Sequence, residues 1–122
     1  MKAVLAILAA SSLASAAQAE PDRATQLRCA AAFMIIGNEQ SRGIPSAKAY
    51  PAMEPRGRYF FESVMGSEAQ ERNLDKDGYR ALAKKQVEAV QMESIAATDP
   101  AKFVKGLMQL CLPILDAKFP PQ

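Results

Sequence analysis

The turn at residues 73–78 reads N-x-D-x-D-G and contains the clearest set of potential metal ligands in the chain. It matches the first, third, fifth and sixth positions of an EF-hand calcium loop, where side-chain oxygens converge and glycine permits a sharp turn. The twelfth position, normally a bidentate glutamate, is Lys84, and the eighth, normally apolar, is Arg80. An Asp-rich turn that caps the following helix is the alternative interpretation. The candidate ligands for weak calcium binding are Asn73, Asp75 and Asp77.

Paired carboxylates are the main catalytic arrangement that the composition leaves open, because they suffice for glycoside hydrolysis. The chain has no histidine, which excludes Ser–His and Cys–His nucleophile pairs and removes the commonest ligand of zinc, copper and haem. We therefore expect no cofactor. The spacing of the acidic residues does not indicate that they converge, and a solvated surface position is the default for glutamate. The first carboxylates to test are Glu39, Glu54, Glu62 and Asp77.

The first 19 residues have the layout of a secretory signal peptide. Lys2 precedes an apolar run at residues 3–13, and an A-x-A cleavage pattern ends at Ala19. An uncleaved anchor is the alternative, but this run is short and alanine-rich, whereas a spanning helix needs roughly 20 strongly apolar residues. We predict cleavage after Ala19 and no integral membrane span in the mature chain. The protein would then be exported, to the periplasm in a Gram-negative bacterium and otherwise into the medium.

Cys29 and Cys111 are the two cysteines of the chain, and each has the other as its one possible partner. In an exported chain such a pair predicts a disulfide, which would close a loop of about 80 residues. Two free buried thiols are the alternative. Neither cysteine belongs to a C-x-x-C-H haem motif, so we assign them a structural role.

The charge balance excludes some classes of partner. The chain has 15 Lys and Arg against 13 Asp and Glu, with the two signs interspersed. Nucleic-acid binding requires a concentrated basic surface, so it is not expected here. The remaining partner classes are an unidentified protein or a small ligand.

The apolar stretch at residues 29–36 predicts a central helix, because it is hydrophobic on most of its circumference. Gly43, followed by Ile44 and Pro45, predicts where this helix ends. We expect an all-α fold, a small bundle of about four helices in which the disulfide joins the first and last. Pro113 predicts a kink or a break in the last helix. The predicted segments are a single helical domain at 20–118, with helices near 23–42, 56–73, 78–97 and from 100 onwards, an ordered connection at 46–55, and a tail at 119–122.

Aromatic, methionine and arginine side chains cluster around the start of the second helix and predict a binding surface, since such residues are enriched at interfaces. Burial in the core is the alternative. The residues are Tyr50, Met53, Arg56, Arg58, Tyr59 and Phe60. Glycines at 37, 66 and 106 lie within or near the ends of predicted helices, where they mark either close helix packing or a groove.

Three functional hypotheses follow from these patterns. The first is a small exported helical protein that acts as a non-catalytic binding, interaction or chaperone-like module. The second is a carboxylate-based hydrolase or an enzyme accessory protein. The third is a weak calcium-binding module that uses the turn at 73–78.

Overall fold

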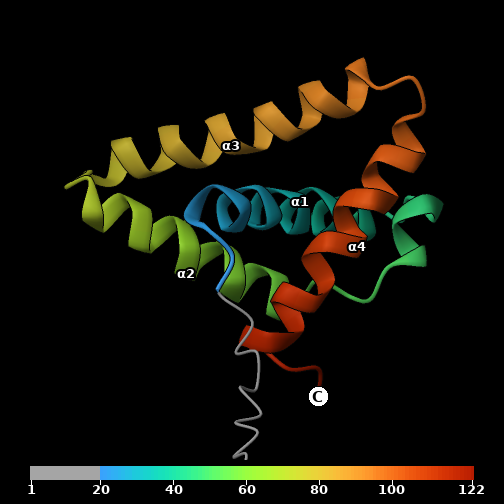
Figure 1. The fold of residues 1–122 in the computed structure, drawn as a ribbon, viewed down its shortest axis with the longest axis horizontal. Helices are drawn as coiled ribbons and strands as arrows, with labels where there is room; N and C mark the ends of the chain where they lie inside the picture. The colour runs from blue at the N-terminus through green and yellow to red at the C-terminus, as the bar shows by residue number, and fades with distance from the viewer. Residues whose placement is uncertain (1–19) are drawn as a thin grey trace, which may run out of the picture.

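The computed structural model describes residues 20–122, so the predicted signal peptide at 1–19 lies outside the described residues. Within the described part the chain is helical and contains no strand, which confirms the predicted all-α bundle of four helices. Figure 1 shows their arrangement. The elements are α1 (Arg23–Ser41), the short 3₁₀ helix η1 (Pro45–Ala49), α2 (Arg56–Glu71), α3 (Lys76–Ala96) and α4 (Pro100–Lys118).

Helix α1 is the centre of the fold and contacts every other element. In Figure 1 it lies between α3 on one side and α2 on the other, while α4 crosses it. Its apolar circumference explains this position, because a helix that is hydrophobic on most sides must be covered on most sides. Phe33 is fully buried and packs edge-on against Phe60 of α2, with ring centroids 5.2 Å apart.

A disulfide between Cys29 and Cys111 joins α1 to α4, which confirms the predicted pairing of the first and last helices. Both cysteines are completely buried, and they are 82 positions apart in the sequence. The crosslink therefore fixes the second half of α4 against the central helix.

Aspartate side chains cap α1, α3 and α4 at their N-termini. Asp22 accepts a hydrogen bond from the Thr25 amide at 2.7 Å, and Asp99 accepts one from the Lys102 amide at 3.2 Å. Both bonds satisfy amides that have no partner within the helix. The sequence predicts these two caps from the position of each aspartate before a helical pattern.

The C-terminal ends of α1 and α2 share one geometry. Gly43 has φ 72°, and the Ile44 amide returns to the Glu39 carbonyl at 3.0 Å. Asn73 has φ 54° and plays the same part after α2, where the Leu74 amide donates to the Ala69 carbonyl at 2.9 Å. These are Schellman motifs, in which a left-handed residue turns the chain out of the helix.

The side chain of Gln40 holds the connection between α1 and α2 in place. Its amide nitrogen donates to the carbonyls of Ala47 at 3.1 Å and Pro51 at 2.9 Å, and its oxygen accepts from the Met53 amide at 3.0 Å. Met53 is consequently held in the core, where its Cβ would lie only 3.1 Å from a Cβ added at Gly57. The connection is thus ordered, as its aromatic and methionine content indicates.

The structure decides two details of the predicted last helix. At Pro113 the predicted break is absent, because α4 continues to Lys118. Pro113 and Gln109 are both exposed, so the carbonyl that loses its helical partner is accessible to water. The sequence pattern places Leu110 on the buried apolar stripe of this helix, together with Leu107 and Cys111. This placement of Leu110 is wrong, because its side chain is 52% exposed. The buried residues of this helix are Leu107, Met108, Cys111 and Leu115.

Candidate functional site

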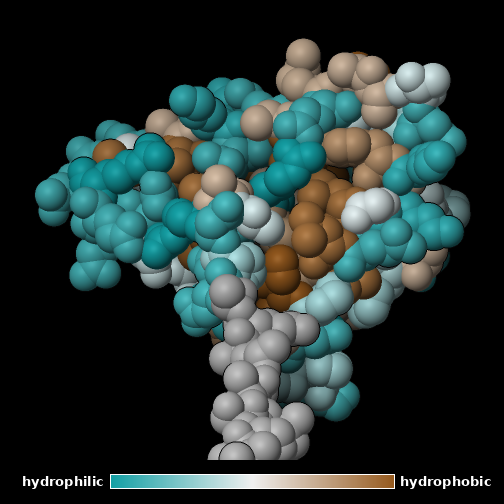
Figure 2. Space-filling view, viewed as in Figure 1, coloured by the Kyte–Doolittle hydropathy of each residue, from teal (hydrophilic) through white to brown (hydrophobic). Residues whose placement is uncertain are grey.

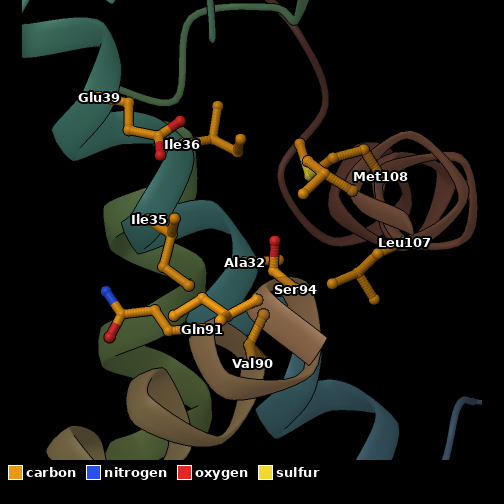
Figure 3. Close-up of a pocket in the computed structure, with 11 residues that line it drawn as sticks. Ala32, Ile35, Ile36, Glu39, Val90, Gln91, Ser94, Leu107 and Met108 are labelled. Atoms are coloured by element: carbon orange, nitrogen blue, oxygen red, sulfur yellow. The ribbon is translucent and has the colours of Figure 1, made fainter. Parts of the chain in front are cut away.

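A groove of about 460 Å³ lies between α1, α3 and α4. Its size falls within the range that is usual for binding sites in proteins. Figure 3 shows the lining side chains directed into it from the three helices. They are Ala32, Ile35, Ile36 and Glu39 of α1, Val90, Gln91, Ser94 and Ile95 of α3, and Val104, Leu107 and Met108 of α4.

The groove exists because α3 diverges from α1 towards the corner where it meets α4 (Figure 1). Only Leu82 and Val90 of α3 are buried, so this helix covers the core along a thin stripe. The small side chain of Ala32 leaves space on the α1 side. The long helix α3 therefore passes over the core without filling the angle that it forms with α4.

Arg28 is one turn before Ala32 on α1 and connects all three helices. Its guanidinium forms an ion pair with Glu93 of α3 and lies over the Phe103 ring of α4, 5.7 Å from the ring centroid. The hydrogen bond from Arg28 lowers the pKa of the Glu93 carboxyl, and the same bond raises the pKa of Arg28. The positive charge of Arg28, next to the Ala32 end of the groove, is thus already neutralised by the carboxylate of Glu93.

Glu39 is the one charged residue among the eleven that line the groove. It is half-buried, and Figure 3 shows its carboxylate beside Ile36, turned towards the space between α1 and α4. No Lys or Arg nitrogen of residues 20–122 lies within 4.0 Å of this carboxylate. By contrast, the acidic side chains that have a basic partner in the same part of the chain are Glu54, Glu62, Glu68, Glu71, Glu88, Glu93 and Asp116.

The rim of the groove is hydrophobic as well as its interior. Ile95 lines the groove and is nevertheless 75% exposed. On the face shown in Figure 2, hydrophobic side chains gather in the angle between α3 and α4 and are framed by hydrophilic ones. Met92, also on α3, is 64% exposed but does not line the groove. These two residues make a matched pair for experiments.

A second depression, of about 600 Å³, lies between the start of α1, α2 and the end of α4. Its lining is more polar and includes Glu20, at the boundary of the described residues, together with Arg23 and Lys118. Arg23 already pairs with Glu71 at 2.9 Å and approaches Glu68 at 3.5 Å. The first groove is therefore the better-defined site.

The residues of the predicted aromatic surface do not converge on either depression as a group. Met53 and Phe60 are in the core, and Tyr50 is half-buried against it. Arg56 is mostly buried and joins α2 to the end of α4, because its guanidinium donates to Asp116 at 2.7 Å and to the Phe119 carbonyl at 2.8 Å. The exposed members of the set are Arg58 and Tyr59, which lie side by side on α2.

The turn at 73–78 is used as a helix connection in the structure. Asp75 is the N-cap of α3 and accepts a hydrogen bond from the Gly78 amide at 2.8 Å. Asn73 is the left-handed residue that ends α2. No group of three acidic or cysteine side chains able to hold a metal ion occurs within residues 20–122. This geometry agrees with the capping alternative for the turn.

Two of the four candidate catalytic carboxylates share one arginine on the exposed side of α2. Glu54 and Glu62 both pair with Arg58 on the exposed side of α2, at 3.0 and 3.4 Å. Glu39 lies in the α1–α3–α4 groove, and Asp77 is in the first turn of α3. Neither depression contains two of these four residues in its lining. The paired arrangement that glycoside hydrolysis requires is not formed at either place.

The groove itself was not predicted, although its residues carry a recognisable signal. Ile95 and Gln91 occur near the end of a helix whose apolar stripe is thin, and a thin stripe leaves neighbouring apolar residues uncovered. Glu39 was singled out as a carboxylate and not as part of a groove. The angle between α3 and α4, which opens the groove, cannot be predicted from the sequence pattern.

Comparison of the chain with protein-family models, with curated proteins and with solved structures found no match. The helices of residues 20–122 include none that is both long enough and apolar enough to cross a membrane.

Proposed function

We propose that this protein is an exported, non-catalytic interaction module that binds apolar side chains of a protein partner in the α1–α3–α4 groove. The observation that carries the proposal is the hydrophobic groove with an exposed isoleucine at its rim. The buried disulfide supports export, because such bonds persist mainly in oxidising compartments.

The form of the groove favours a protein partner over an enclosed small molecule. A typical small-ligand site buries most of its ligand, whereas here a large apolar side chain at the edge is three-quarters exposed. The volume of 460 Å³ corresponds to about 15 water molecules. That space suits a few inserted side chains, as when an amphipathic helix lies along a groove and anchors itself by residues spaced i, i+3 or i+4.

A selective interaction fits the surface better than a general chaperone activity. A promiscuous holdase needs a broad apolar surface, whereas large exposed apolar patches are rare on this kind of domain. In the described chain the exposed large hydrophobic residues are distributed over three helices and the α2–α3 turn, and α3 is the helix that carries two of them. They are Tyr59, Leu74, Met92, Ile95 and Leu110.

The proposal is tested with a synthetic amphipathic helical peptide that has leucines at i, i+4 and i+7 and uncharged polar residues elsewhere. Titration into the isotopically labelled protein should shift the amide resonances of the groove helices. Ile95→Asp should weaken the peptide affinity by at least tenfold, because burying an isoleucine is worth about 1.5–3 kcal/mol. Met92→Asp is the control and should leave the affinity unchanged. Equal losses in both variants, or no saturable shift, would refute the assignment.

A further inference from the structure

Resting on the proposed function, we infer that the partner segment carries a lysine or arginine that pairs with Glu39. The groove is charged at one position only, and that charge has no basic partner within the described chain. An occupant that covers Glu39 must remove water from its carboxylate. Removing that water without providing a donor is costly, so a wholly apolar occupant is disfavoured.

The other lining residues decide which charge the partner group opposite Glu39 must have. Gln91 and Ser94 are the other polar residues, and both are neutral. Arg28, one turn before Ala32 on α1, is paired with Glu93 and does not offset the charge of Glu39. A cation on the partner would therefore meet one unmatched negative charge, while an anion in the same place would be repelled in a partly desolvated site.

The position of Glu39 also orients the partner. Glu39 and Ala32 are seven residues apart on α1, which places them about 10 Å apart along the helix axis. A partner helix whose leucines insert beside Ile35 and Leu107 would bring its next turn to the Glu39 end of the groove. The basic residue is thus expected at one end of the apolar stripe of the partner helix. There it selects one of the two opposite directions in which that helix can lie along the groove.

The experiment uses the peptide already described, with a single terminal position of the stripe occupied by Lys, Gln or Glu, at each end in turn. For the wild-type protein, the better Lys peptide should bind about tenfold more tightly than the Glu peptide, with Gln between them. Glu39→Gln should remove this preference, and Glu39→Lys should reverse it. The preference should also decrease at high salt, as a partly exposed ion pair is screened.

Glu88→Gln is the matched control, because Glu88 is an acidic residue of α3 that pairs with Lys84 outside the groove. It should keep the full preference for Lys. Thermal unfolding of Glu39→Gln should match the wild type, since its side chain makes no ion pair within residues 20–122. Equal binding of all three peptides would overturn the inference and leave the proposed function standing. If the neutral peptide also fails to bind, both are refuted.

Discussion

Loss of the Cys29–Cys111 disulfide should lower the stability of the protein more than any other single covalent change. The bond closes a loop of 82 positions. On the chain-entropy model, a crosslink of that span removes enough freedom from the unfolded chain to stabilise the fold by about 4.5 kcal/mol. A domain of this size has a total unfolding free energy of about 5–15 kcal/mol, so the reduced protein would retain little stability.

The magnitude converts to a large thermal shift. Unfolding entropies are roughly 2.1 cal/mol/K per residue, which gives about 0.2 kcal/mol/K for a domain of about 100 residues. Reduction should therefore lower Tm by about 20 °C. The measurement is the helical circular dichroism signal during heating, with and without a thiol reductant, at a fixed scan rate.

The double variant Cys29→Ala, Cys111→Ala separates the crosslink from other effects of the reductant. Its Tm should be as low as that of the reduced protein or slightly lower, because both sulfurs are completely buried and their removal also leaves a small cavity. Added reductant should not change it. A fall of less than 5 °C in the reduced wild type would show that the unfolded chain is already compact, and the loop-entropy argument would then be wrong.

Three other predictions concern stability and are each measured by chemical or thermal unfolding. Gly106→Ala should stabilise α4 by up to about 1 kcal/mol, because an added Cβ there meets nothing within 4 Å, whereas Gly57→Ala should destabilise the protein, because its Cβ would lie 3.1 Å from the Met53 side chain. Equal effects would contradict the packing argument. Gln40→Ala should cost about 2 kcal/mol by leaving the carbonyls and the amide of the connection without their partner, and an effect below 0.5 kcal/mol would show that water replaces the side chain. Since the pKa of Glu93 is lowered from its ordinary value of 4.5 by the hydrogen bond from Arg28, the unfolded chain binds more protons near that pH. The unfolding free energy should consequently decrease as the pH falls below about 4.5 and through the folded-state pKa, and Glu93→Gln should show a smaller decrease.

The local features of the fold were predictable because each depends on a few neighbouring residues. Asp22, Asp99 and Gly43 are placed where caps and helix ends require them, and the structure uses them in those roles. The disulfide was predictable for a different reason: a chain with only two cysteines leaves one intramolecular pairing. Neither inference requires knowledge of how the helices cross.

The features that depend on distant parts of the chain were not predictable to the same degree. The apolar residues of α4 occupy more than half of its circumference, so periodicity does not show that Met108 and Leu115 are buried while Leu110 is exposed. Gln40 has the polarity of a surface residue, yet its role depends on a connection that returns to it from Met53, 13 positions later. The groove depends on the crossing of three helices, which no local pattern encodes.

Between residues 91 and 106, where α3 ends and α4 begins, no side chain is fully buried. The corner is therefore held by its ion pair and partial contacts, while the covalent link lies farther along α4 at Cys111. Segments with so little burial open at a small fraction of the global unfolding free energy. Amide hydrogens of the corner should thus exchange with solvent far faster than those of α1. Under the proposed function, a partner would enter the groove from this side through a local opening that leaves the crosslinked half of the molecule intact.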